Sequence, residues 1–87
     1  MTIYLYPRYR RNYKRLATQL QKLADERIAT FRDNMFDSRL DTHRLHGKLK
    51  NQWSFSVDNK NRILFEFLTK KKDEVVFLDI GDHSIYR

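Results

Sequence analysis

The chain has 87 residues, 40% of them hydrophobic, and a formal net charge of +7 at pH 7, so we expect one domain, residues 1–87, with a single core. It contains no cysteine, which excludes a disulfide framework and any zinc–thiolate site, and it has no apolar stretch near the ~20 residues that a membrane helix needs. The positive charge makes nucleic acid the leading class of partner; the alternative is that the charge only serves solubility.

The N-terminal segment predicts a short strand followed by a basic helix. Residues 3–6 are aromatic and aliphatic and end at Pro7, which suits the first turn of a helix. From Arg8 to Leu16 apolar side chains recur with helical spacing, and the cations lie mostly off that stripe. This N-terminus lacks the regions of a signal peptide, so we expect a cytoplasmic protein. Because helical spacing fixes several cations on one side, the cations expected to bind RNA phosphates are Arg8, Arg11 and Arg15.

The second helix is predicted to begin at Thr18. The run Thr18-Gln19-Leu20-Gln21 has the capping-box pattern, in which the hydroxyl and the Gln21 amide satisfy backbone donors reciprocally. We expect the two helices to form a hairpin laid on a sheet, and residues 37–42, which show no period, to form a loop. The apolar stripe of the second helix comprises Leu20, Leu23, Ala24, Ile28, Phe31 and Met35.

Three strands are expected in the C-terminal half. Residues 53–58 alternate strictly between apolar and polar side chains, which is typical of a strand with one buried face. A turn leads to a strand from Arg62 to Leu68, and a charged loop leads to a nearly continuous apolar strand over 75–80, expected to be central. The predicted core includes Trp53, Phe65 and Phe77. The order β-α-α-β-β-β indicates an α+β fold, an antiparallel sheet with the N-terminal strand at an edge and the helical hairpin on one face.

The residue types that metal-free RNA cleavage needs recur beside these strands. His43 and His46 precede the first of the three strands, Arg62 begins the second, and His83 and Tyr86 follow the last. The three histidines and the scattered aspartates show no metal-ligand spacing, so no metal and no cofactor are expected.

Taken in order, these segments resemble the RelE/ParE superfamily of bacterial type II toxins, and within it the mRNA interferases of the RelE, YoeB and YafQ type. The resemblance covers nearly the whole chain. It rests on the aromatic N-terminal strand, the helical hairpin, the segment His43–Lys50 before Trp53-Ser54, the Arg-Ile-Leu-Phe run at 62–65 and the Gly-Asp-His run at 81–83. It implies a cognate antitoxin as partner, and the ribosome and mRNA as targets.

The resemblance also implies a reaction, in which the 2′-hydroxyl of an mRNA nucleotide attacks its own 3′-phosphate. Such a step needs a proton acceptor, a proton donor and a fixed cation for the charge on phosphorus. By position, His43 is then the general base, Arg62 the phosphate ligand and His83 the general acid. Tyr86 is the terminal aromatic, able to stack on a base or to bind phosphate.

Each role has a plainer alternative. His43 could be an exposed loop histidine, Arg62 a surface arginine paired with Glu66 or Asp58, and Tyr86 a core residue. Around the candidate base, Lys48 and Lys50 flank Leu49 and would point the same way from an extended segment, toward RNA phosphates or simply toward solvent. Either lysine, or His46, could take the role of the base.

The same residues are compatible with two other functions. A ParE-like toxin inhibits DNA gyrase through protein contacts and needs no acid and base around an arginine. A non-catalytic basic RNA-binding module would keep its activity after loss of either histidine. The imidazoles and the arginine favour the ribonuclease over both.

Overall fold

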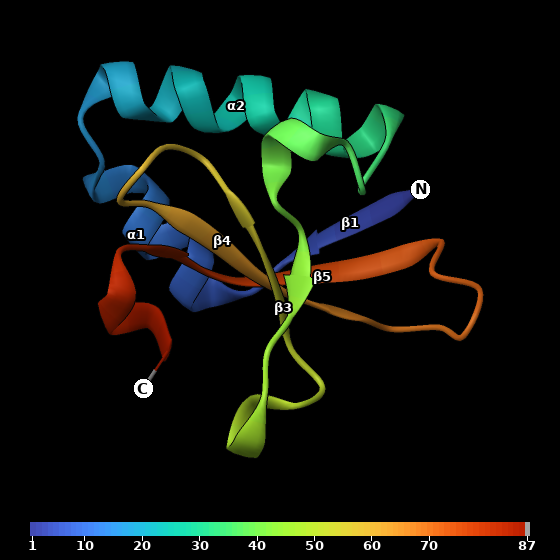
Figure 1. The fold of residues 1–87 in the computed structure, drawn as a ribbon. Helices are drawn as coiled ribbons and strands as arrows, with labels where there is room; N and C mark the ends of the chain where they lie inside the picture. The colour runs from blue at the N-terminus through green and yellow to red at the C-terminus, as the bar shows by residue number, and fades with distance from the viewer. Residues whose placement is uncertain (87) are drawn as a thin grey trace.

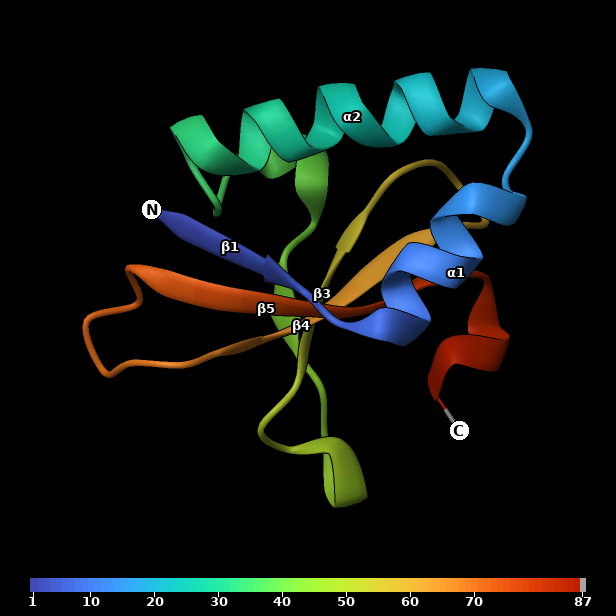
Figure 2. The same cartoon turned by 180° about the vertical axis from the view of Figure 1, so that it is seen from behind.

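A computed structural model describes residues 1–86, in which one sheet is covered by two helices (Figures 1 and 2). The strand order is β1-β5-β4-β3-β2. The expected α+β architecture is confirmed. The elements are β1 (Thr2–Leu5), α1 (Pro7–Arg15), α2 (Thr18–Asp33), η1 (Ser38–Leu40), β2 (His43–Arg44), η2 (Gly47–Leu49), β3 (Trp53–Ser56), β4 (Arg62–Phe67), β5 (Glu74–Gly81) and η3 (His83–Tyr86), where η marks a 3₁₀ turn.

The sheet is mixed. Strands β2, β3, β4 and β5 pair in antiparallel fashion, whereas β1 lies at an edge and runs parallel to β5. Nearly the whole chain separates β1 from β5, so no hairpin turn imposes the antiparallel direction on this pair. The apolar strand β5 is an interior strand, between β1 and β4. A further strand, β2, forms where the sequence indicated no element, because two residues pair with the start of β3.

The two helices begin near the predicted positions, but the capping box at Thr18 is wrong. Helix α2 starts at Thr18 with Ala17 as its N-cap residue, and no side chain caps it. The Gln21 amide instead donates to the backbone carbonyl of Tyr13, at 2.9 Å. This carbonyl lies in the last turn of α1 and also accepts the backbone N–H of Leu16, at 3.1 Å. Gln21 therefore ties the two helices together.

The core lies between the helices and one face of the sheet. Phe31 of α2 is fully buried, with its ring centroid 4.5 Å from that of Phe55 and 5.7 Å from that of Phe77. Tyr9 of α1 packs on the same Phe77 ring at 5.4 Å. Both helices therefore cover a single face, as predicted for the hairpin.

The predicted core residues are not equally buried. Phe65 and Phe77 are fully buried, whereas Trp53 is only half-buried and lies at the margin of the core, beside the exposed Phe36. Trp53 is the register partner of Phe65, and the exposed Phe36 and the partly buried Phe67 flank its ring at the margin of the core. Aromatic surface of Trp53 therefore remains accessible.

Helix α2 does not cover the second face of the sheet, to which β3 and β4 contribute four polar side chains and the apolar Leu64. Successive side chains alternate between faces, so the residues that alternate with the core positions share this helix-free face. Here η3 and the η2 loop lie on the side of the sheet away from α2 (Figure 1). Across residues 1–86 no helix combines the length and apolarity needed to cross a membrane. The residues of β3 and β4 on the helix-free face are Ser54, Ser56, Arg62, Leu64 and Glu66.

Candidate active site around Arg62

Arg62 stands at the start of β4 with its side chain only 18% exposed. Its Nε donates to Oγ of Ser54 at 2.8 Å, and its Nη1 donates to Oγ of Ser56 at 2.7 Å. Both serines lie on β3, where Ser56 is the register partner of Arg62. A third bond runs from Nη2 to the backbone carbonyl of Asp41, at 2.7 Å. These bonds fix the plane and position of the guanidinium.

Asp41 contacts both Arg62 and His43. It ends η1 in the left-handed conformation, with φ 47° and ψ 47°, a region that costs a non-glycine residue free energy. Its carboxylate Oδ2 lies 3.4 Å from Nη1 of Arg62 and is 73% exposed. The left-handed turn directs the Asp41 carbonyl toward Arg62 and His43, and it leaves the carboxylate at the surface of the site.

His43 lies on β2 opposite Ser54. Its Nδ1 is 2.9 Å from the Asp41 carbonyl oxygen and 3.3 Å from Nη2 of Arg62. A carbonyl oxygen can only accept and a guanidinium can only donate, so the two contacts require opposite roles of Nδ1. In the tautomer that serves the shorter contact, Nδ1 carries the proton and donates to the Asp41 carbonyl. The other nitrogen, Nε2, then carries a lone pair on an exposed ring. This tautomer suits a general base.

The C-terminal turn η3 brings two more predicted residues to Arg62. The Tyr86 hydroxyl donates to Oγ of Ser54 at 3.2 Å, and the His83 ring stacks edge-on against the Tyr86 ring, with centroids 6.0 Å apart. Arg62, His83 and Tyr86 line one pocket of about 160 Å³, together with Asn59, Lys60 and Asp82. Residues from β2, from the start of β4 and from the turn after β5 thus meet around Arg62, although they are far apart in the sequence.

The alternative pairings of Arg62 do not occur. Its carboxylate neighbour is Asp41, and Asp58 instead accepts from the backbone N–H groups of Lys60 and Asn61 in the β3–β4 turn. These two bonds lower the pKa of Asp58 despite partial burial of its carboxyl. Asp58 is therefore a turn residue.

Sequence reasoning missed three members of the cluster, Asp41, Ser54 and Ser56. The two serines had a local signal, because they are the polar members of the alternating run in β3 and so face away from Phe55. Asp41 had no such signal in the sequence, because its contact with Arg62 depends on the backbone conformation at the end of η1.

The loop that carries the two candidate lysines differs from the prediction. Residues 47–49 form the 3₁₀ turn η2, entered through a left-handed Gly47, rather than an extended segment. Side chains two residues apart diverge on such a turn, so Lys48 and Lys50 do not share a direction. Both are exposed, and within the part of the chain that the structure describes neither ammonium group makes a hydrogen bond or ion pair.

The cations of α1 lie on its exposed surface. Arg8, Arg11 and Arg15 are spaced by three and four residues, which places them along one side of the helix. Arg8 lines a pocket on the helix-free face of the sheet, together with Leu64 of β4. The basic side of α1 therefore borders the same face as Arg62.

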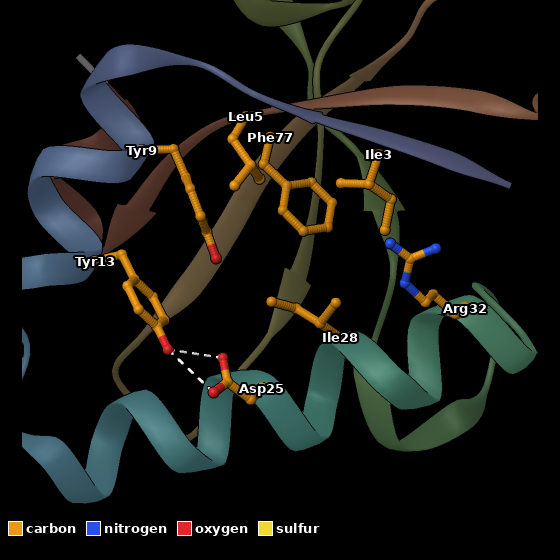
Figure 3. Close-up of a pocket in the computed structure, with 8 residues that line it drawn as sticks. All are labelled: Ile3, Leu5, Tyr9, Tyr13, Asp25, Ile28, Arg32 and Phe77. Carbon is orange, nitrogen blue, oxygen red and sulfur yellow. Dashed lines mark hydrogen bonds between the residues drawn. The ribbon is translucent and has the colours of Figure 1, made fainter.

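A separate pocket of about 230 Å³ opens on the helix side, between β1, α1 and α2 (Figure 3). Its one pair of hydrogen-bonded side chains joins the Tyr13 hydroxyl to Asp25, at 2.8 and 3.0 Å from the two carboxylate oxygens. Burial, aided by Asp25, raises the pKa of Tyr13. Phe77 lines this pocket from the core face, so the sheet separates it from Arg62.

No family model matches the sequence, and no curated protein matches it either. Solved structures do match over nearly the full length. The YoeB/ParE toxin from Agrobacterium tumefaciens superposes with a TM-score of 0.79 at 13% identity, covering 95% of this chain and 99% of that one. YafQ from E. coli strain BL21(DE3) gives 0.76 at 12%, covering 97% and 94%. The toxin–antitoxin complex RelBE2 from Mycobacterium tuberculosis gives 0.66 at 16%, covering 94% and 96%. The chain has the RelE/YoeB-type toxin fold.

Proposed function

We propose that this protein is the toxin of a type II toxin–antitoxin system and that it cleaves mRNA on the ribosome without a metal ion. The observation that carries the proposal is the cluster around Arg62. A fixed guanidinium lies 3.3 Å from one imidazole and shares a pocket with a second. The fold is that of toxins, and the net charge of +7 suits an RNA substrate.

In this proposal the site performs a transesterification. Nε2 of His43 accepts the proton of the 2′-hydroxyl, whose oxygen attacks the adjacent phosphorus. The bond from phosphorus to the 5′-oxygen of the next nucleotide breaks, and His83 donates a proton to that oxygen. Arg62 stabilises the charge on the phosphorane, and the Tyr86 ring orients the RNA. The products are a 2′,3′-cyclic phosphate and a 5′-hydroxyl.

Phosphate binding requires one exchange at Arg62. Nε is held by Ser54, and both Nη atoms have partners, but the contact with the Asp41 carboxylate is long and exposed. An incoming phosphate oxygen would take the place of this carboxylate at Nη1. The two serines and the Asp41 carbonyl would keep the guanidinium in position during the exchange.

In vitro translation with toeprinting tests the activity directly. The wild-type protein should cut mRNA at defined codons on ribosomes, in the presence of a chelator that leaves ribosomes intact, and it should leave a 2′,3′-cyclic phosphate. The folded Arg62→Ala variant serves as the matched control. Absence of any cut, with the protein folded, would reject the ribonuclease.

Inhibition of DNA gyrase is the second candidate, because one of the matching structures is described as a YoeB/ParE toxin. This activity would not depend on His43 or His83. A supercoiling assay with purified gyrase separates the two functions, since the ribonuclease leaves gyrase unaffected.

We further propose a cognate antitoxin as partner and the cytoplasm as the location. Support comes from the RelBE2 match, which is a toxin–antitoxin complex. A basic exposed site is silenced most readily by an acidic segment, which neutralises its charge. Co-expression with the product of the adjoining reading frame should restore growth to cells that the toxin arrests.

A further inference from the structure

We propose that the pocket next to Arg62 on the helix-free face binds a guanine base of the RNA and that Glu66 recognises it. This inference rests on the proposed ribonuclease function and adds a base preference to it. The pocket has a volume of about 330 Å³. Its lining residues are Tyr6, Arg8, Leu49, Gln52, Leu64, Glu66, Leu78 and Ile85.

Strand β4 sets the distance between the pocket and the cleavage site. Arg62, Leu64 and Glu66 alternate along the same face, and a strand rises ~3.3 Å per residue. Glu66 therefore stands about 13 Å along the strand from Arg62, with Leu64 halfway. A phosphate held at Arg62 would leave a neighbouring base over Leu64, with its outer edge toward Glu66.

The floor of the pocket suits the face of a base. Leu64 and Ile85 are buried, and Leu78 is half-buried beside them. The Tyr6 ring borders the pocket and is 50% exposed, so it is available for stacking. Single-stranded bases bind proteins largely through such apolar and aromatic contacts.

The polar groups of the pocket lack partners within the molecule. Across residues 1–86 neither the Glu66 carboxylate nor the Arg8 guanidinium makes a hydrogen bond or ion pair. Oε1 of Gln52 is buried and also has no partner among these residues. Buried polar atoms are nearly always hydrogen-bonded in folded proteins, so the unpaired Oε1 of Gln52 points to a ligand that donates a hydrogen bond there. Glu66 is half-buried and Arg8 is exposed at the rim, so both remain available to the same ligand.

The charge of Glu66 selects among the bases. An ionised carboxylate only accepts hydrogen bonds, through two oxygens side by side. Guanine presents two adjacent donors on its Watson–Crick edge, N1–H and the 2-amino group, whereas each of the other three bases presents one donor there. Only guanine can therefore form a bidentate pair with Glu66. Arg8 at the same rim is placed to bind a phosphate of the same strand.

Nucleotide titrations followed by NMR of ¹³C-labelled leucine methyl groups test the pocket without any cleavage. GMP should shift the methyl signals of Leu64 and Leu78, with an affinity about tenfold higher than that of AMP, CMP or UMP, as expected for one bidentate pair. Glu66→Gln should remove this preference. The matched control is Glu26→Gln, an exposed substitution on α2, on the other side of the sheet, which should leave the preference unchanged.

The outcomes separate this inference from the proposed function. Equal shifts with all four nucleotides, or a guanine preference that survives in Glu66→Gln, would overturn the recognition by Glu66. Ribosomal cleavage with no methyl shift from any nucleotide would overturn the pocket and leave the ribonuclease standing. Selective GMP binding by a protein that cuts no mRNA would support the pocket and reject the ribonuclease.

Discussion

Arg62 and Tyr86 donate hydrogen bonds to the same atom, Oγ of Ser54, at 2.8 and 3.2 Å. Ser54 is fully buried, so this hydroxyl has no access to water. The bond to Tyr86 holds the C-terminal turn η3 against the sheet, and the bond to Arg62 fixes the guanidinium at Nε. One hydroxyl thus couples the position of the phosphate ligand to the position of the segment that carries His83.

Ser54→Ala should weaken cleavage and stability together. The substitution leaves Nε of Arg62 and the Tyr86 hydroxyl without their acceptor, and an unpaired buried donor costs about 1–3 kcal/mol. We expect a lower midpoint in urea and a reduced single-turnover rate. Thr18→Ala is the control, because the Thr18 hydroxyl caps nothing. Wild-type cleavage by a folded Ser54→Ala protein would show that this coupling has no role.

Arg62→Ala should abolish cleavage with little effect on folding, since one preorganised charge donor contributes roughly 10²–10³ in rate. Arg62→Lys should not restore activity, because a single ammonium group cannot reach both serines and the Asp41 carbonyl as the planar fork does. Toeprinting gives the activity and circular dichroism the fold. Arrest of growth by a folded Arg62→Ala protein at the wild-type level would remove Arg62 from the mechanism.

The two histidines should give a single-turnover rate that passes through a maximum as pH varies. The base must be neutral and the acid protonated, so the rate falls on both sides of the maximum. His43→Ala should lose the acid limb of the profile and His83→Ala the alkaline limb. A flat profile, with normal rates in both variants, would end the histidine mechanism.

The effect of substituting Asp41 on stability should depend on whether the new residue tolerates the left-handed backbone conformation. Asparagine tolerates the left-handed region, so Asp41→Asn should fold normally and keep the carbonyl that binds Arg62 and His43. It should bind inorganic phosphate more tightly, because the carboxylate that competes for Arg62 is absent. A β-branched side chain is strained at φ 47°, so Asp41→Val should lose about 1–3 kcal/mol of stability. Phosphate titration and urea unfolding measure the two effects. Equal behaviour of both variants would contradict this account.

Stability should decline in alkaline solution because of two tyrosines of α1, the buried Tyr9 and the partly buried Tyr13. Burial raises the pKa of Tyr9 above its usual 10.0, and burial together with Asp25 raises that of Tyr13. A raised pKa means that the folded state holds the proton more tightly, so this contribution is complete below pH 10 and is lost as pH rises above it. Tyr9→Phe should therefore flatten the alkaline decline in thermal midpoint. The exposed Tyr6 provides the control as Tyr6→Phe.

Local patterns were sufficient to predict most of the fold. The apolar stripe of α2 and the apolar positions of β3, β4 and β5 follow from the 3.6- and two-residue periods, because burial of one face imposes these periods on the sequence. The same alternation placed Arg62 opposite the core face. The periodicity did not define the edges of the sheet, so neither β2 nor the parallel pairing of β1 could be predicted.

The sequence by itself therefore determined the elements, the helix-covered core and the residue types available for chemistry. Only the tertiary structure decided which of these groups meet. The bonds of Arg62 reach back 21 residues to Asp41, and the Tyr86 hydroxyl reaches 32 residues back to Ser54. Such contacts depend on strand register and on one left-handed residue at the end of η1. No local period encodes either feature, because hydrogen-bond partners across a sheet are set by the packing of the whole chain.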